Sequence, residues 1–242
     1  MPLRRTLFIS DLHLDASRPE ATARFEKFLA ATAPGSDALY ILGDLFEYWV
    51  GDDGLTLEFP HRIAGTLKAT ASQLPVSFMH GNRDFLVASE FSAATGVQLI
   101  PDPTTVGLYG RKTLLMHGDT LCTDDKEYQA FRAQVRNPAW QRAALARPLK
   151  ERVAMAQGLR ADSEDAKAGK SMEIMDVSTR AVEEAFASCG CDLLVHGHTH
   201  RPGHHVHRVN GRECERWVLP DWYGRGGYLE ISPDGVRALE LP

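Results

Sequence analysis

The sequence of 242 residues contains no apolar run approaching the roughly 20 residues that a membrane-spanning helix needs. The apolar stretch near the N-terminus stops at Asp11, which is too soon for a secretory signal peptide. Cysteine is scarce, and its four positions suit neither a disulfide framework nor a zinc ribbon. Cys189 and Cys191 either bind a metal or pack as small buried residues near a helix end. These absences favour a cytoplasmic protein.

The chain also lacks net positive charge. Its 27 basic and 32 acidic side chains give a formal charge of −5, which argues against a general nucleic-acid binder. The charge is unevenly distributed, because residues 126–170 alone carry ten basic and five acidic side chains. A chain with one basic segment is expected to meet an anion through that segment.

Short apolar runs recur along the chain, and each ends at a cluster of polar residues. Runs of this length between glycine and aspartate predict buried strands, and they cover residues 7–10, 38–42, 76–79, 113–116 and 192–195. Amphipathic stretches between them predict helices at 18–33, 58–73 and 176–189. After residue 203, alternating apolar residues and turn signals predict antiparallel strands. We therefore expect an α/β fold with covered sheet faces, in a single domain spanning residues 1–242.

Residues 124–170 interrupt this alternation. They are helical in composition, with Pro138 and Pro148 as breakers. We interpret the segment as an inserted helical cap within the domain. Its apolar stripe is expected to bury against the sheets or to line a groove, and it consists of Tyr128, Phe131, Val135, Trp140, Leu149, Val153 and Leu159.

The polar clusters share one kind of side chain. Aspartate, asparagine and histidine recur in them, at Asp11, His13, Asp44, Asn82, His117, His198 and His200. The carboxyl ends of strands in α/β sheets gather such residues in space. Oxygen and imidazole ligands suit Mn, Fe, Zn or Ni. Seven ligands are too many for one ion and enough for two, provided that one carboxylate bridges them.

The motifs D-x-H, G-D, G-N, H-G-D and G-H-T-H, in this order, resemble the calcineurin-like metallophosphoesterase superfamily. One branch, the UDP-2,3-diacylglucosamine pyrophosphatases of lipid A biosynthesis, resembles the chain from about residue 4 to residue 230. The matching segments are 10–14, 43–47, 81–86, 117–125, 170–177 and 196–202. The resemblance implies a metallophosphoesterase four-layer α-β-β-α sandwich with an inserted helical cap at residues 124–170.

The resemblance also assigns ligands to two divalent ions, with manganese as the implied metal. The first ion would be held by Asp11, His13, Asp44 and His200. The second would be held by Asp44, Asn82, His117 and His198. Asp44 would bridge them, and the ions would activate a shared water.

Arg83 stands where most of the superfamily carries histidine. Arginine holds phosphate oxygens bidentately but is a poor general acid, so the leaving group should need little protonation. The resemblance implies a catalytic set of Asp44, Asn82, Arg83 and His198. It implies metal-hydroxide attack on the α-phosphorus of UDP-2,3-diacylglucosamine, which gives UMP and 2,3-diacylglucosamine 1-phosphate (lipid X).

Substrate contacts carry over by the same resemblance. They are expected at Asn82, Arg83, Asp125, Ser163, Lys170 and His198. Lys167 is a further candidate, although the better-known members carry asparagine there. Asp119 and His196 are expected either to orient metal ligands or to serve as turn residues. His204, His205 and His207 are not expected to bind metal, because seven ligands are already supplied.

The implied partners are a lipid-linked nucleotide sugar and the cytoplasmic face of the inner membrane, where the protein would be peripheral and its cap would receive two acyl chains. Neither nucleic acid nor an obligate protein partner is expected. Three alternatives remain: another metallophosphoesterase acting on nucleotides or phosphoproteins, a nuclease of the same fold, and a non-enzymatic scaffold. Arg83 and the basic cap weigh against the first, the net charge against the second, and the complete ligand set against the third.

Overall fold

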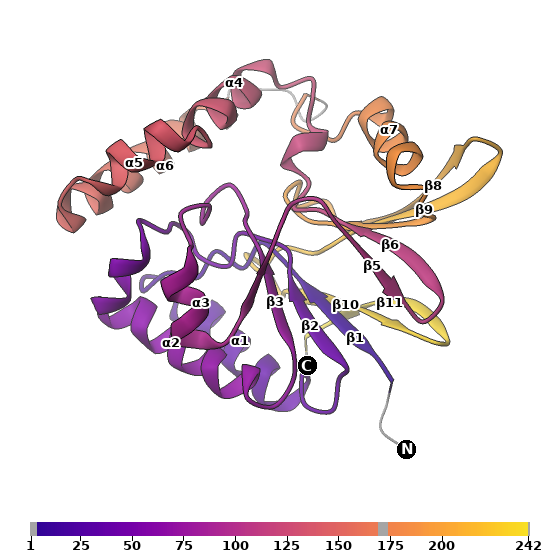
Figure 1. Ribbon diagram of the computed structural model, residues 1–242, viewed down its shortest axis with the longest axis horizontal. Coiled ribbons are helices and arrows are strands. Elements are labelled where there is room, and N and C mark those ends of the chain that lie inside the picture. Colours follow the sequence, from indigo (N-terminus) through magenta and orange to yellow (C-terminus); the bar gives the residue numbers. More distant parts are fainter. Residues whose placement is uncertain (1–3, 169–173, 242) are drawn as a thin grey trace.

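Two β-sheets lie face to face, and helices cover both outer faces (Figure 1). The computed structural model describes residues 4–168 and 174–241, with side chains for 4–160 and 174–241. Among the helices of these residues, none is long and apolar enough to cross a membrane.

The first sheet has the strand order β11-β10-β1-β2-β3-β4. Its strands are β1 (Thr6–Ile9), β2 (Ala38–Ile41), β3 (Val76–Met79), β4 (Gln98–Ile100), β10 (Gly227–Ser232) and β11 (Gly235–Glu240). Strands β1 to β4 are parallel, which requires crossover helices between them. These helices are α1 (Pro19–Ala31), α2 (Glu58–Ala71), preceded by the short 3-10 helix η1 (Asp52–Thr56), and α3 (Ser89–Thr95).

The second sheet has the strand order β5-β6-β7-β9-β8. It consists of β5 (Thr104–Leu108), β6 (Arg111–Leu115), β7 (Leu193–His196), β8 (Gly203–Val209) and β9 (Arg212–Val218). The 3-10 helix η2 (Asp119–Leu121) follows β6, and α7 (Thr179–Cys189) packs on the outer face. The expected turn at Asn210–Gly211 joins β8 to β9 as an antiparallel hairpin.

Three apolar cores separate the four layers. Along β1, Leu7 and Ile9 face the core shared with the crossover helices, whereas Phe8 faces the core between the sheets. Along β7, Val195 faces the core between the sheets and Leu194 faces α7. These two central strands therefore supply both of their faces to a core, and the expected four-layer α-β-β-α sandwich is confirmed.

All five expected strands and the three expected helices are present, with ends shifted by up to three residues. The sequence interpretation missed α3 and the two short strands β4 and β5. Strand β4 has three residues, and β5 has one buried residue, so neither shows a hydrophobic run. The turn signal at residues 233–235 correctly predicted the hairpin between β10 and β11.

Three helices form an arm over one edge of the sandwich (Figure 1). They are α4 (Lys126–Val135), α5 (Pro138–Leu145) and α6 (Leu149–Ala168). The Asp125 side chain caps α4 by accepting from the Tyr128 N–H at 3.0 Å, and Asn137 caps α5 by accepting from the Ala139 N–H at 2.8 Å. Pro138 starts α5, where its missing N–H costs nothing. We call residues 126–168 the cap helices below.

Four cap-helix arginines point into the sandwich. Arg132 donates to Asp119 at 2.7 Å and Arg136 donates to the Gly81 carbonyl at 2.8 Å. Arg160 donates to Glu47 at 2.6 Å. Arg152 is buried and bonds to Asp53 and to the Val50 carbonyl. These arginines dock the cap helices, and all four also line the cavity between the cap helices and the sandwich.

Candidate functional site

The five polar clusters meet where the two sheets open toward the cap helices. Asp11, Asp44 and Asn82 follow the first three strands of the first sheet, while His117 and His198 follow β6 and β7 of the second. The backbone N–H of His198 donates to Asp11 Oδ2 at 2.9 Å, which ties the two sheets together at this edge. The structure thus brings together all seven side chains expected to bind metal.

Five of these seven residues have left-handed backbone. The φ angle is 55° at Asp11, 50° at His13, 52° at Asp44, 68° at His198 and 54° at His200. Such a conformation is uncommon for a residue with a Cβ and costs of order 1–3 kcal/mol when the surroundings impose it. Only two other non-glycine residues of the described chain share it. Strain concentrated in this way marks a functional site.

Two motif glycines are required because neighbouring atoms pack closely against them, and not because of their φ angles. A Cβ on Gly81 would lie 2.1 Å from Asp44 Oδ1, and one on Gly197 would lie 2.2 Å from Asp11 Oδ2. No residue with a Cβ fits at such distances. These glycines let the ligand-bearing loops approach one another.

One group of candidate ligands consists of Asp11, His13 and His200. Their donor atoms lie within 4.8 Å of one another. The Nε2 atoms of the two histidines are 3.3 Å apart, and His200 Nε2 is 3.4 Å from Asp11 Oδ1. Asp11 Oδ1 is buried and accepts no hydrogen bond, which is costly unless a cation compensates it.

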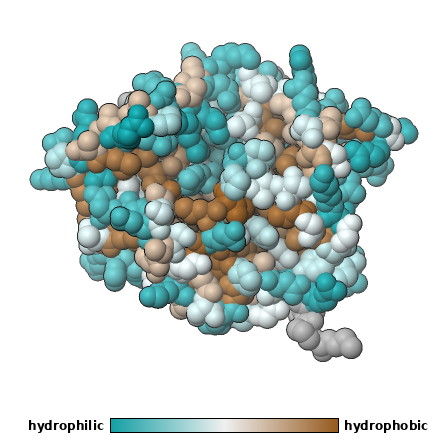
Figure 2. All heavy atoms as spheres, viewed as in Figure 1, coloured by the Kyte–Doolittle hydropathy of each residue, from teal (hydrophilic) through white to brown (hydrophobic). Residues whose placement is uncertain are grey.

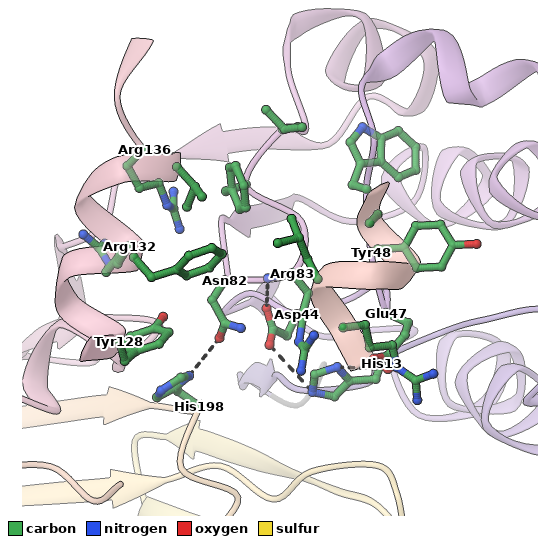
Figure 3. A pocket seen from close by; sticks show the side chains of 18 of the residues that line it. His13, Asp44, Glu47, Tyr48, Asn82, Arg83, Tyr128, Arg132, Arg136 and His198 are labelled. Carbon is green, nitrogen blue, oxygen red and sulfur yellow. Dashed lines mark hydrogen bonds and ion pairs between the residues drawn. The ribbon is translucent and has the colours of Figure 1, made fainter. Parts of the chain in front are cut away.

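A second group surrounds Asn82 (Figure 3). Its Oδ1 lies 3.1 Å from His117 Nε2 and 2.9 Å from His198 Nδ1, so three donor atoms converge on one point. Asp44 lies between the two groups. Its Oδ1 is 3.9 Å from His117 Nε2, and its Oδ2 is 3.7 Å from His13 Nε2. One carboxylate therefore turns one oxygen toward each group, as a bridging ligand requires.

Surrounding bonds orient these ligands. The Nδ1 of His117 lies 2.9 Å from the Leu42 carbonyl, which leaves Nε2 directed at the site. Ser10 Oγ donates to Asp11 Oδ2 at 2.6 Å, and the Arg83 N–H donates to Asp44 Oδ1 at 2.8 Å. The oxygen and imidazole donors, their burial and their convergence fit two divalent metal ions.

The histidines of the second group differ in pKa. Burial opposes protonation of His117, but Asp44 and Asp119 outweigh it and raise its pKa to about 9. Burial and the charge of His117 lower the pKa of His198 to about 4. At neutral pH His198 is a ready ligand, whereas His117 would release a proton when a cation binds.

A cavity of about 680 Å³ opens between these ligands and the cap helices. Asn82, Arg83, Asp125 and His198 line its polar end, and Arg83 projects into it beside Asp44 (Figure 3). Its apolar wall is formed by Trp49, Phe85, Phe131, Val135, Trp140, Met155 and Leu159, and the four docking arginines of the cap helices also line the cavity. Figure 2 shows this hydrophobic band under a hydrophilic outer surface.

The apolar stripe of the cap divides between two surroundings. Tyr128, Phe131, Val135, Trp140 and Leu159 line the cavity, whereas Leu149 and Val153 do not. The side chains of the expected contacts Ser163 and Lys167 lie outside the described residues, and so does Lys170 entirely.

Asp119 and His196 are buried, and their side chains bond to residues other than the metal ligands. Asp119 accepts from Tyr128 Oη at 2.9 Å as well as from Arg132, and His196 Nε2 lies 3.1 Å from an Arg216 nitrogen. His204 pairs with Glu215 and stacks on Trp217. Within the described chain, His204, His205 and His207 join no ligand group.

Sequence reasoning gave no role to Glu47, Arg160 and Tyr223. Glu47 Oε2 lies 3.4 Å from His13 Nδ1, and the Tyr223 ring stacks on His13 at 5.0 Å. Glu47 lies in the G-D motif segment and its exposed fraction is only 2%. An acidic residue three positions after a candidate ligand is a sequence signal that could have identified Glu47.

Comparisons with known proteins agree with this arrangement. The family model described as calcineurin-like phosphoesterase matches residues 4–202. A curated UDP-2,3-diacylglucosamine hydrolase from Xanthomonas campestris pv. campestris is 51% identical over 98% of this chain and 98% of its own length. One from Stenotrophomonas maltophilia is 48% identical over 95% of this chain and 96% of its own. The chain therefore belongs to the calcineurin-like phosphoesterase family and, within it, to the family of the UDP-2,3-diacylglucosamine hydrolases.

Proposed function

We propose that this protein hydrolyses the diphosphate bond of UDP-2,3-diacylglucosamine, giving UMP and 2,3-diacylglucosamine 1-phosphate in lipid A biosynthesis. The observation that carries the proposal is that a cluster of candidate metal ligands lies at a cavity with an apolar wall. The first suits a diphosphate, and the second suits acyl chains. The curated relatives at 48–51% identity carry this activity in their names.

The metal assignment follows the two groups of donor atoms. Asp11, His13 and His200 would hold one ion, Asn82, His117 and His198 would hold the second, and Asp44 would contact both. We assign Mn²⁺ to both sites. When bound, the ions lower the pKa of a water molecule toward neutrality and neutralise charge on the phosphoryl oxygens.

The residues around Asp44 orient the phosphate for attack at the α-phosphorus. Arg83 lies in the cavity, where its planar guanidinium can hold two phosphoryl oxygens at once. Arginine keeps its proton near neutral pH, so it stabilises charge and supplies no proton. A sugar phosphate leaves as a stable anion and needs none. Asn82 and His198 contact the same phosphate from the opposite side of Asp44.

The remaining substrate contacts come from the segment 124–170, which we propose to be a cap inserted into one domain. Asp125 lines the cavity and also caps α4, so a substrate contact there would be tied to the position of that helix. Ser163, Lys167 and Lys170 would contact the substrate from the far end of the segment. The apolar cavity wall would receive the two acyl chains.

We further propose that the protein is cytoplasmic and peripheral on the inner membrane, with the cap helices toward the lipid. Phe131 and Leu145 are 41% and 42% exposed on these helices. Arg142 and Lys150 are exposed there as well, and each basic side chain near an anionic surface contributes about 1 kcal/mol.

Comparing three substrates tests the proposed activity. With Mn²⁺ present, kcat/KM should be largest for UDP-2,3-diacylglucosamine and far lower for bis(p-nitrophenyl) phosphate and a phosphoprotein. Strong hydrolysis of the last two with none of the lipid would contradict the proposal and indicate a phosphodiesterase or a protein phosphatase.

A further inference from the structure

Glu47 is a buried carboxylate between a candidate metal ligand and the cap helices. Its Oε2 lies 3.4 Å from Nδ1 of His13, whose Nε2 faces Asp44 and His200 (Figure 3). The two ring nitrogens of His13 thus face opposite ways, one toward the metal site and one toward Glu47. Among the described residues Nδ1 of His13 makes no hydrogen bond, so its contact with Glu47 is an ion-pair contact. A carboxylate beside the second ring nitrogen of a ligating histidine orients the ring.

Two side chains from distant parts of the chain hold Glu47. Arg160 of α6 donates to Oε1 at 2.6 Å, and Tyr223 Oη donates to Oε2 at 3.3 Å. The Tyr223 ring also stacks on His13, and the Arg18 guanidinium lies 4.3 Å from the centre of the tyrosine ring. Each oxygen of Glu47 therefore accepts one hydrogen bond. Oε1 accepts from the cap helices, and Oε2 accepts from the segment before β10.

Charge explains why this arrangement needs Arg160. A carboxylate that is almost fully buried is costly unless cations and donors compensate it. Arg160 supplies such a cation at 2.6 Å from Oε1, and Tyr223 supplies such a donor at 3.3 Å from Oε2. Without the arginine, the carboxylate would lose its hydrogen bond at 2.6 Å and could turn away from His13.

In the second group of ligands, His117 is oriented in another way. The Nδ1 of His117 bonds to the carbonyl of Leu42, a backbone group at the end of β2. That bond belongs to the sandwich and does not depend on the cap helices. His13 and His117 therefore differ in what orients them, whereas the ring of His198 lies 5.6 Å from that of Tyr128 on α4.

We propose that Glu47 is a positioning residue for His13 and that Arg160 holds it in place, so that docking of α6 raises the affinity of the first metal site. This inference rests on the proposed metal role of His13. It adds to the proposed function a physical link from the helices that cover the substrate cavity to one of the two ions.

Titrating Mn²⁺ into metal-free protein, with calorimetry as the readout, tests the link without using activity. Loss of an outer partner of a metal ligand weakens binding by about 10- to 100-fold, so Glu47→Ala should lower the affinity of one site by that factor and leave the other unchanged. Arg160→Ala should weaken the same site by about 3- to 10-fold. Arg160→Lys should restore most of this loss, because lysine still donates to the carboxylate.

A double-mutant cycle separates the link from general destabilisation. If Arg160 acts through Glu47, the variant with both alanines should bind as Glu47→Ala alone. Arg62 and Glu26 form a matched ion pair at 2.8 Å between α2 and α1, far from the ligands in the fold. Arg62→Ala and Glu26→Ala should bind both ions as the wild type does. Thermal melting of the metal-free variants shows that each is folded.

The outcomes are distinguishable. Wild-type affinity at both sites in Glu47→Ala and Arg160→Ala overturns the link, and so does equal weakening in the Arg62 and Glu26 controls. A failure of the metal assignment itself would be seen in His13→Ala, which should lose one of two ions. If His13→Ala keeps both, the proposed site is wrong, independently of Glu47.

Discussion

The ligand-bearing edge of the sandwich and the cap helices are built on different principles. At the edge, Asp11, His13, Asp44 and His117 are at most 2% exposed, and their loops are held by backbone strain and close-packed glycines. The cap helices instead expose apolar residues and are docked by a few arginine contacts. Many packing contacts hold the edge in one conformation, whereas a few individual arginine contacts hold the cap helices.

This difference indicates that hydrolysis depends on the ligand-bearing edge and that substrate selection depends on the cap helices. Strained ligands can persist only where packing on both sheets enforces them, so changes at the edge should alter kcat and metal content together. Changes in the cavity wall should alter the use of the lipid substrate and leave the hydrolytic chemistry intact. The four predictions below test that division, from the largest expected effect to the smallest.

Replacing the bridging carboxylate should have the largest effect. Asp44→Ala should lower kcat by at least about 10³-fold, because it removes a ligand from both sites and raises the barrier by ~4 kcal/mol or more. Metal content by mass spectrometry should fall below two ions per chain. Asp234→Ala, in an exposed turn, is the matched control and should behave as the wild type. Near-normal kcat with two ions bound would refute the bridge.

Arg83→His should lower turnover of UDP-2,3-diacylglucosamine by about 10- to 100-fold, the effect of losing hydrogen bonds to a charged group. The variant should remain folded, because the Arg83 contact to Asp44 is made by the backbone N–H. Arg83→Lys keeps the charge without the planar fork and should be intermediate. Steady-state kinetics identical to the wild type would remove Arg83 from the site.

Trp140→Ala tests the cavity wall. Trp140 lies on the apolar wall 6.3 Å from the Phe85 ring, so its loss should lower kcat/KM for the diacylated substrate by about 10-fold. Hydrolysis of bis(p-nitrophenyl) phosphate should not change. Leu57 is 38% exposed and lies outside the cavity wall, so Leu57→Ala is the control. An equal loss of kcat/KM on both substrates would contradict the assignment of hydrolysis to the edge and substrate selection to the cap helices.

The smallest effect concerns a docking contact. The hydrogen bond and charge of Arg152 lower the pKa of Asp53 below its ordinary value of 3.8. A carboxyl with a depressed pKa stabilises the fold above its ordinary pKa, and this contribution disappears as the pH falls through the folded value. Since the Asp53 side chain is 55% exposed, screening keeps the contribution below about 1 kcal/mol.

Asp53→Asn should therefore lower the Tm of the metal-free protein by about 1–2 °C at pH 6. The difference from the wild type should shrink as the pH falls below 3.8. Calorimetry at several pH values provides the measurement. A difference that is constant over the whole range would show that the carboxylate charge plays no part.

The candidate ligands were predictable because each lies in a short motif directly after a strand, where local sequence and the sheet edge together define its position. The fold class followed from the strand and helix alternation and from the resemblance that these motifs carry. Left-handed backbone at Asp11 and Asp44 was not predictable, since tertiary packing imposes it on residues that ordinarily avoid it.

Contacts between the cap helices and the sandwich could not be predicted from the sequence. Glu47 and Arg160 are 113 residues apart, and no local pattern pairs them. The basic residues of the cap were counted as one surface charge, although Arg132 and Arg160 are used to dock it. Composition reports how much charge a segment carries, whereas only the fold decides which side chains turn inward.

The destination of the oxygen atom from water tests the central claim most directly. Hydrolysis of UDP-2,3-diacylglucosamine in ¹⁸O-water, with the products analysed by mass spectrometry, identifies the phosphorus that is attacked. Attack at the α-phosphorus, oriented by Arg83 and Asn82 beside Asp44, places the label in UMP. Label in 2,3-diacylglucosamine 1-phosphate would contradict this account of the site.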